Sequence, residues 1–379
     1  MSEAKITVRA GEHDRHGCPV TVTIDSFSGL DNGTVTLIDQ DGERSTGQYT
    51  TNKETADITW ILNNLSAHTQ RTYTISSSPS QSSGSGVSFS EQDNAIGISV
   101  DGRHFTTFRY GTDQYRPYFF PVHGPGGRQV TRGDTSEESK DHIHHRSLYV
   151  AYGEVNHADF WSEGQNAGRI IHKNFTERSE GSVVGKIYTQ NSWVDKSGNP
   201  LMSDLQNFRI YALPEDRAII DLDLTLLAEH GDVFFGDTKE GGIITVRVNP
   251  QMNASNETGK IENAFGGINE NETWGKKAHW CDYSGVVDGT SVGVAVFDHL
   301  SNPRYPTYWH VRNYGLMGSN IFGGGTFEED KSKDGSYTLQ SGAQMDFRFR
   351  VYIHAGDATQ GNVGQRYHDF INPPDVVAS

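Results

Sequence analysis

Residues 219–228 read IIDLDLTLLA, and apolar and polar side chains alternate along this segment. Successive side chains of an extended strand point to opposite faces of a sheet. One face then carries four aliphatic residues and the other carries three polar ones: Ile220, Leu222, Leu224 and Leu226 against Asp221, Asp223 and Thr225. The pattern therefore predicts a long strand with one buried face.

Similar segments flank this strand on both sides, at residues 87–111, 169–179, 182–195, 206–214, 291–299 and 336–356. Helical periodicity is nearly absent, although residues 361–371 could form a short helix, and the polar residues 251–277 are expected to form a long loop. With 42 glycines and 34% hydrophobic residues, the composition favours a turn-rich β protein. We predict an all-β fold, a large two-sheet antiparallel sandwich of about 250 to 280 residues, larger than an immunoglobulin-type domain.

The amino-terminal part has shorter strands of its own. Residues 4–75 contain five β-branched, roughly alternating segments separated by Gly, Asp and Asn. A Ser/Gly run, SSPSQSSGSG, follows at residues 77–86 and is typical of a linker or exposed loop. The expected organisation is a small β-domain over residues 1–76, a linker over 77–86 and the large sandwich over 87–379.

Charge and composition exclude several kinds of partner. The net charge of −16 makes nucleic acid and anionic membranes poor partners, because binding phosphate requires a basic face. The two cysteines, Cys18 and Cys281, indicate neither a disulfide framework nor a zinc ribbon. The first residues lack the apolar region of a secretion signal and no window approaches 18 apolar residues, so we expect a cytoplasmic protein. The oligomeric state stays open.

Residues 116–163 combine five of the 16 histidines with aromatic rings and charged groups. They read RPYFFPVHGPGGRQVTRGDTSEESKDHIHHRSLYVAYGEVNHADFWSE. A pocket that grips a polar ligand needs both rings and titratable groups. We interpret this stretch as the site and the rest as its scaffold.

The spacing His142-x-His144 leaves three interpretations open. On a strand the two imidazoles share a face with Arg146, whereas His145 and Tyr149 take the other face. Two imidazoles on one face can bind a divalent metal ion with a third ligand from elsewhere. They can also bind a sugar and shuttle protons, or serve structure alone.

Carboxylates and a tryptophan follow the histidines. Asp159 and Glu163 are candidate acid and base groups for glycosidic chemistry, with Glu154 nearby. Taken singly, each is also compatible with an ordinary ion pair at the surface. Trp161 could stack on a sugar or belong to the core.

A second candidate stretch lies about 165 residues downstream of these histidines. Strand spacing puts His310, Arg312 and Tyr314 on one face, which would suit an oxyanion or enolate, while Trp309 faces the core. Lys239 and Glu240, at the tip of a turn, are weaker candidates whose alternative role is a surface ion pair.

The motifs RPYFFPVHGPGG, DHIHHRSLYVAYGEVNHADFW, GDTKEGG and YPTYWHVRNYGLMGSNIFGG carry a family resemblance. Over about residues 95 to 360 the chain resembles a bacterial family of unknown function (DUF6807-like) that is often labelled PmoA. It departs from the family pattern at Glu154, where Asp is usual, at His157, where Gly is usual, and at Ile321, where Pro is common. The methane-oxygenase label contradicts a sequence without membrane-spanning helices. The resemblance implies a galactose-mutarotase-like sandwich and carbohydrate chemistry.

We therefore expect a carbohydrate-active enzyme that cleaves a glycoside or its 3-keto form, as a hydrolase or a β-eliminating lyase. His144 or His145 would abstract a proton. His310, Arg312 and Tyr314 would stabilise the enolate, and Glu163 or Asp159 would protonate the leaving oxygen. A divalent metal on His142 and His144 is a further expectation. The expected substrate-binding residues are Arg116, Tyr118, His123, Arg146, His157, Trp161, Lys239 and Glu240. The alternatives are an aldose mutarotase or epimerase, and a non-catalytic sugar-binding protein.

Overall fold

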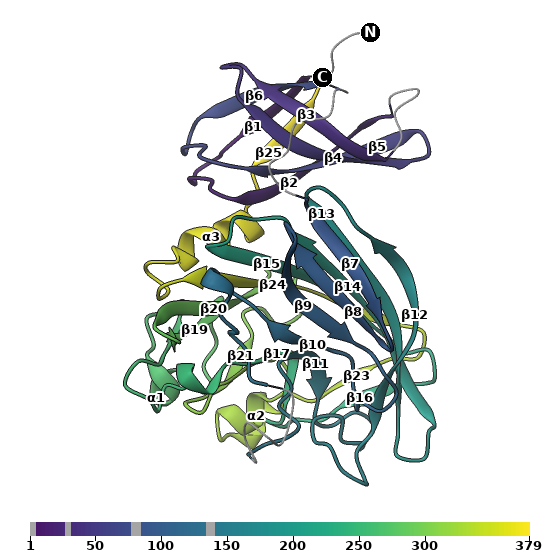
Figure 1. Cartoon of the computed structure of the whole chain (residues 1–379). Coiled ribbons are helices and arrows are strands. Elements are labelled where there is room, and N and C mark those ends of the chain that lie inside the picture. Colours follow the sequence, from purple (N-terminus) through teal and green to yellow (C-terminus); the bar gives the residue numbers. More distant parts are fainter. Residues whose placement is uncertain (1–4, 27–31, 77–84, 134–140) are drawn as a thin grey trace.

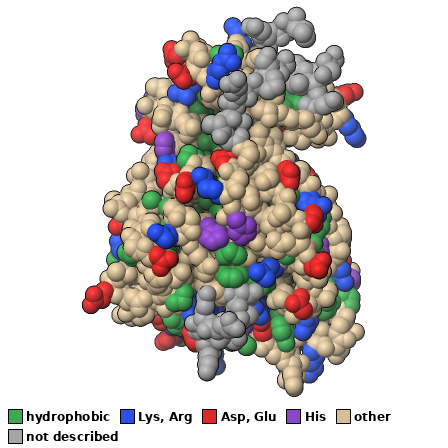
Figure 2. All heavy atoms as spheres, viewed as in Figure 1, with side chains coloured by type: hydrophobic (Ala, Val, Ile, Leu, Met, Phe, Trp, Pro, Cys, Tyr) green, Lys and Arg blue, Asp and Glu red, His purple; other side chains and the backbone are tan. Residues whose placement is uncertain are grey.

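The protein is described here by a computed structural model, which covers residues 5–26, 32–76, 85–133 and 141–379. Two bodies follow one another along the chain, a small sheet above and a large sandwich below (Figure 1). The predicted linker lies mostly outside the described residues, which resume at Ser85. The space-filling view shows the smaller body seated on the larger one, with acidic and basic side chains interspersed over the visible face (Figure 2).

The small sheet has seven strands in the order β2-β5-β4-β3-β6-β1-β25. Trp60 and Tyr73 are fully enclosed in its core. Its strands are β1 (Lys5–Arg9), β2 (Cys18–Asp25), β3 (Gly33–Asp39), β4 (Arg44–Asn52), β5 (Thr55–Leu62), β6 (Gln70–Ser76) and β25 (Asp375–Ala378). The prediction that the large sandwich extends to residue 379 is corrected here, because β25 pairs antiparallel with β1.

The large body is a sandwich of two eight-stranded antiparallel sheets, as predicted. The site sheet contains, in spatial order, β21 (Tyr308–Arg312), β22 (Leu316–Asn320), β17 (Gly241–Arg247), β11 (Leu148–Tyr152), β10 (Tyr118–Val122), β9 (Arg103–Arg109), β8 (Ala95–Val100) and β7 (Val87–Gln92). The back sheet contains β12 (Arg169–Ser179), β13 (Val184–Val194), β14 (Pro200–Tyr211), β15 (Arg217–Leu227), β24 (Gln344–Ala355), β20 (Thr290–Asp298), β19 (Trp280–Val287) and β18 (Lys260–Asn263). A short pair, β16 (Val233–Phe235) and β23 (Tyr337–Leu339), lies beside them.

Strand β15 packs as its alternation predicted. Its aliphatic face is at most 1% exposed and belongs to the core between the two sheets. Its polar face is partly covered as well, because Asp221 is 4% exposed and accepts hydrogen bonds of 2.6 and 2.8 Å from Arg350. Charged side chains can occupy such a place only as paired groups, which local alternation cannot reveal.

Short helices close the ends of the sandwich: α1 (Asn269–Thr273), α2 (Gly324–Phe327), α3 (Val363–Ile371), η1 (Pro125–Gly127), η2 (Pro250–Met252) and η3 (Lys331–Lys333). The helix expected near residues 361–371 is therefore present. The loop expected over 251–277 is wrong in part, since it contains η2, β18 and α1. Strand β18 forms because Ile261 is fully buried opposite Tyr283 of β19, a partner distant in sequence.

The two bodies are joined by buried polar contacts. The Gln48 side chain accepts hydrogen bonds from the backbone of Val183 and Val184 at 3.0 and 2.8 Å. Arg15 and Asp369 form an ion pair of 3.2 Å with side chains that are 2% and 3% exposed. Helix α3 and strand β25 thus connect the end of the sandwich to the small sheet (Figure 1). Within the described residues, we find no helix with the length and apolar character needed to cross a membrane.

Candidate functional site

The candidate site lies on the outer face of the site sheet. In β11, Leu148 and Val150 belong to the sandwich core, whereas Tyr149 and Ala151 point to the opposite face. Trp161 packs against this outer face from residues 153–168, which we call the tryptophan loop. The side chains of the stretch predicted to be the site therefore lie on both faces of one sheet. Leu148 and Val150 face the core, and Tyr149 and Trp161 lie on the outer face.

Residues 141–147, the histidine loop, form turns and not the predicted strand, which begins only at Leu148. His142 has a φ of 45°, and the backbone N–H of His145 donates to its carbonyl at 2.9 Å. The predicted separation of His145 from His142 and His144 is therefore wrong. The ring centroids of His144 and His145 are 4.4 Å apart, and His142 stacks on His145 at 4.8 Å.

Two buried arginines hold this loop in place. Arg132 donates to the carbonyl oxygens of Asp141, His142 and His145 at 2.8, 2.6 and 3.0 Å. Arg116 donates to the carbonyl of His144 at 2.9 Å. It also reaches three carbonyls of the tryptophan loop, those of Phe160, Trp161 and Ser162, at 3.0, 2.7 and 3.3 Å. Arg116 is 2% exposed, so it ties the two loops together and does not face a ligand as predicted.

The second predicted stretch, from His310 to Tyr314, lies beside the histidine loop. Tyr314 stacks on His142 with 5.0 Å between ring centroids. His310 is 2% exposed and its ring lies 6.0 Å from that of Trp161. The structure thus brings together stretches that the sequence separates widely. Arg312 differs from the expectation, because its guanidinium pairs with Glu270 at 2.6 Å on the wall of another cavity.

Burial keeps the three central imidazoles uncharged. It lowers the pKa of His144 to about 4, with Arg116 and His142 adding to the effect. The pKa of His310 falls to about 3 for the same main reason, with Arg312 and Lys239 contributing. The pKa of His145 also lies well below its usual value because of burial. At neutral pH these side chains are therefore neutral hydrogen-bonding groups.

Arg247 determines which ring nitrogen of His145 carries the proton. Its Nη1 donates to Nδ1 of His145 at 2.8 Å, so the ring proton resides on Nε2. The guanidinium also lies over the ring of Tyr314, at 4.7 Å from its centroid. Sequence reasoning missed Arg247, since nothing local to VRVNP distinguishes it from a surface residue. Strand β17 pairs with β11 and carries it to the site.

A cavity of about 490 Å³, the site cavity, opens beside this cluster. His144, Trp161, Glu154, Asp159 and Glu240 are among the residues that line it. Several buried polar atoms around it have no hydrogen-bond partner: the Tyr149 hydroxyl, Nε1 of Trp161 and both ring nitrogens of His310. Buried polar groups are rarely left unpaired in native proteins, so this concentration is typical of a place that receives water or a ligand.

The two carboxylates predicted as catalytic are both engaged. Glu163 forms a two-point pair with Arg146, with Nε donating to Oε1 at 2.9 Å and Nη2 to Oε2 at 2.5 Å. Asp159 accepts from the backbone N–H of Trp161 at 2.8 Å and of Ser162 at 3.0 Å. The prediction that one of them protonates a leaving group stays a prediction, and in this structure both carboxylates shape the tryptophan loop.

The remaining predicted binding residues are dispersed. Tyr118 is 1% exposed beneath Arg146, whose guanidinium lies 5.7 Å from its ring. His123 lies elsewhere, 5.5 Å from the ring of His104 beside a separate small cavity. His157, paired with Glu154 at 3.1 Å, is on the rim of the site cavity.

Lys239 and Glu240 form an ion pair with each other. Glu240 lines the site cavity, whereas Lys239 lines the larger cavity beside it. The pair therefore stands between two cavities and is not an isolated contact at a turn.

The arrangement does not fit the expected metal ion. The ring centroids of the expected ligands, His142 and His144, lie 5.8 Å apart, and Nδ1 of the neighbouring His145 is occupied by Arg247. Guanidinium groups surround the histidine loop, and their positive charge disfavours a second cation. Across the described ranges, no group of three or more His, Cys, Asp or Glu side chains could hold a metal.

The lowered pKa of His144 predicts how stability changes with pH. In the unfolded chain this histidine titrates near its ordinary 6.5, whereas the pKa of the folded group is about 4. Between these values the unfolded chain binds more protons, so its contribution to the free energy of unfolding is present above pH 6.5 and is lost as the pH falls towards 4. We expect the urea midpoint to drop over this interval, and to drop less steeply in His144→Gln. Equal slopes in the two proteins would contradict the assignment.

Comparisons with known proteins show the family of the chain but not its activity. The sequence matches no curated protein. A family model described as "Family of unknown function (DUF6807)" matches residues 95–368. This range includes the histidine loop, the tryptophan loop and the segment from His310 to Tyr314.

Solved structures match the chain at low identity. An α-mannosidase from Enterococcus faecalis V583 is 9% identical with a TM-score of 0.44, and the match covers 100% of this chain and 46% of that one. A glycosyl hydrolase family 38 protein from Enterococcus faecalis is 10% identical with a TM-score of 0.43, covering 100% of this chain and 47% of that one. A GalM/aldose epimerase homologue from C. elegans is 9% identical with a TM-score of 0.31, covering 72% of this chain and 100% of that one. The chain thus spans less than half of the first two.

Proposed function

Because the chain belongs to the DUF6807 family of unknown function, we propose a function from the site itself. We propose a carbohydrate-active enzyme that cleaves a glycoside in its 3-keto form by β-elimination. The observation that carries the proposal is the group of neutral imidazoles, His144, His145 and His310, beside aromatic rings and guanidinium groups. Such a pocket suits an uncharged, hydroxyl-rich ligand.

His144 is the proposed base. In a 3-keto sugar the C2–H is acidic, because the neighbouring carbonyl accepts the electron pair. His144 lines the site cavity and, with a pKa of about 4, is unprotonated at neutral pH. A base of this strength resembles the carboxylates that other enzymes use to remove a proton next to a carbonyl.

His145 and Tyr314 are the proposed donors to the carbonyl oxygen. Arg247 leaves the proton of His145 on Nε2, and a neutral imidazole can donate a hydrogen bond to a developing enolate. Burial raises the pKa of Tyr314, so its hydroxyl also stays a donor. Both groups are held in place before the substrate arrives, which is what stabilisation of a transient charge requires.

The proposed step balances without a redox partner. The C2–H bond breaks, the proton goes to His144 and the electron pair moves onto the C3 oxygen. The pair then returns to form the C1–C2 double bond while the bond from C1 to the glycosidic oxygen breaks. That oxygen takes the proton from His144, and the products are an unsaturated keto sugar and a free alcohol.

Elimination is favoured over hydrolysis by the state of the carboxylates. A glycosidase uses one carboxyl group as acid and another as nucleophile or base. Here Glu163 is paired with Arg146, and Asp159 caps the backbone of the tryptophan loop. The two other carboxylates of the cavity, Glu154 and Glu240, are paired with His157 and Lys239. By contrast, no ion pair among the described residues engages the imidazole of His144 or of His310.

The test compares oxidised and unoxidised glycosides. Purified protein is incubated with 3-keto glycosides and their parent glycosides, and products are followed by mass spectrometry and by the ultraviolet absorbance of the unsaturated ketone. We expect consumption of the keto forms alone. Turnover of the parent glycosides at an equal or higher rate would refute elimination in favour of hydrolysis.

A second candidate is an aldose mutarotase or epimerase. It is favoured by one observation, that His144 and Glu240 line the same cavity and could act as an acid–base pair. Proton NMR of anomer interconversion separates this activity from elimination. A non-catalytic sugar-binding protein would instead show a calorimetric binding signal with neither product nor interconversion.

A further inference from the structure

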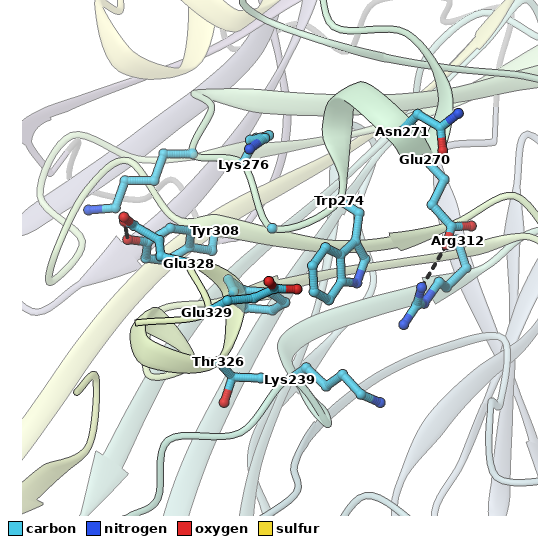
Figure 3. A pocket seen from close by; sticks show the side chains of 13 residues that line it. Lys239, Glu270, Asn271, Trp274, Lys276, Tyr308, Arg312, Thr326, Glu328 and Glu329 are labelled. Atoms are coloured by element: carbon cyan, nitrogen blue, oxygen red, sulfur yellow. Dashed lines mark hydrogen bonds and ion pairs between the residues drawn. The ribbon is translucent and has the colours of Figure 1, made fainter. Parts of the chain in front are cut away.

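A second and larger cavity, the Trp274 cavity, adjoins the site cavity. Its volume is about 1110 Å³, against about 490 Å³ for the site cavity. Helix α1, strand β21 and helix α2 contribute its walls, and Figure 3 shows Trp274 standing between Arg312 on one side and Tyr308 on the other. The function proposed above leaves this cavity without a role.

The aromatic rings of this cavity pack against one another. The rings of Trp274 and Phe327 meet edge to face at 5.3 Å, and Tyr308 stacks on Phe327 at 5.6 Å. The guanidinium of Arg312 lies 5.2 Å from the Trp274 ring. Nε1 of Trp274 is buried without a hydrogen-bond partner. A fixed indole with an unused donor suits a ligand that has both C–H faces and polar groups.

The polar groups of this cavity are mixed in sign. Four cationic side chains, Lys239, Lys276, Lys277 and Arg312, line it together with three anionic ones, Glu270, Glu328 and Glu329. Some are already paired, as in the contact of Arg312 with Glu270 at 2.6 Å. Sugar hydroxyls both donate and accept hydrogen bonds, so a wall that holds both donors and acceptors suits a neutral sugar better than an ion.

His310 is buried between a wall residue of one cavity and a wall residue of the other. Its ring is 6.0 Å from Trp161, which lines the site cavity, and 6.3 Å from Phe327, which lines the Trp274 cavity. The pair formed by Lys239 and Glu240 contributes one residue to each cavity. Neither ring nitrogen of His310 makes a hydrogen bond of regular geometry within the described ranges, although the backbone of Gly241 lies close enough to raise its pKa against the effect of burial. Such an imidazole has hydrogen-bonding capacity left for a ligand that spans the two walls.

We propose that the Trp274 cavity is a second sugar subsite, and that the ligand is a glycoside of at least two neutral sugar units with His310 at the junction. The inference rests on the proposed function in one respect, that the site cavity holds the first sugar. The second unit would be the leaving group, with its C–H face on Trp274 and its hydroxyls toward Glu270 and Arg312.

Calorimetric titration of the full chain tests this subsite without requiring turnover. The probes are methyl glucoside and methyl galactoside as single units, and cellobiose, maltose and lactose as pairs, in native form, and also in 3-keto form with His144→Ala present so that the ligand is bound and not cleaved. In Trp274→Ala we expect at least tenfold weaker binding of the disaccharides, with less than a twofold change for the single units. Trp274→Phe, which keeps an aromatic surface, should retain most of the disaccharide affinity.

A second variant covers the case in which Trp274→Ala does not fold. Asn271 is exposed on α1 and lines the cavity, so Asn271→Trp should fill the cavity without disturbing the core and should weaken disaccharide binding alike. Unchanged disaccharide affinity in these variants, with single sugars still bound, would overturn the subsite and leave the proposed function standing. Binding of acidic disaccharides such as digalacturonate in preference to neutral ones would overturn the neutral-sugar assignment. A wild-type protein that binds none of the sugars would overturn both.

Discussion

Replacing His144 with alanine is expected to lower kcat/KM for a 3-keto glycoside by about 10²- to 10⁴-fold, the range that a positioned general base contributes. The loss should fall mainly on kcat, because the pocket walls formed by Trp161, Glu154 and Thr238 remain. His144 is half-buried at the cavity wall and its carbonyl, not its ring, receives the Arg116 hydrogen bond. The fold should therefore survive the change.

Initial rates against substrate concentration, followed by the absorbance of the unsaturated ketone, measure this effect. Added imidazole should restore part of the activity to His144→Ala, since the base alone is missing. A suitable control is His68→Ala, because the His68 side chain is 69% exposed in the small body. A kcat within threefold of wild type in His144→Ala would remove this histidine from the mechanism.

Replacing Arg116 with alanine is expected to lower the free energy of unfolding by about 3 to 5 kcal/mol, the cost of breaking a buried charged network. Arg116 is 2% exposed and donates to the carbonyls of His144, Phe160, Trp161 and Ser162. In the variant these buried oxygens lose their donor together, and few water molecules could replace it. Both loops of the site should loosen, so activity should fall with stability.

Urea denaturation followed by tryptophan fluorescence gives this value. Arg103→Ala is a matched control, because its pair with Glu215 is 3.1 Å long but the two side chains are 50% and 53% exposed. Exposed pairs of this kind contribute about 0 to 1 kcal/mol. Equal losses in Arg116→Ala and Arg103→Ala would show that Arg116 does not hold the loops.

Those parts of the fold that depend on local alternation were predictable. Strand β15 shows its buried face directly in IIDLDLTLLA, and the same rule identified most strands of both sheets. Strand β18 was missed because its four residues carry little pattern and form only against β19. Strand β25 was assigned to the wrong body, because no local signal shows that its partner is β1.

The sequence indicated which stretches lie close together, but it did not reveal their geometry. A density of histidines and rings marks residues 116–163 in any reading of the sequence, yet alternation treats His142 to Arg146 as a strand. The backbone turns there because Arg132 gathers three carbonyls of the loop, an interaction across the fold. The contacts of Glu163 and Asp159 were not predictable for a similar reason, since a paired carboxylate cannot be distinguished in sequence from a free one.

The pairing of β1 with β25 has a consequence for biosynthesis. Ile6 lies opposite Ala378 in this sheet. One edge of β1 therefore has no partner until residues some 370 positions later in the sequence have been synthesised. While the ribosome extends the chain, the other edge of β1 can pair with β6, but this edge stays open. An unpaired strand edge is a template for association with other chains. The nascent protein is therefore most exposed to aggregation until β25 emerges, and a chaperone that shields β1 during translation should raise the yield.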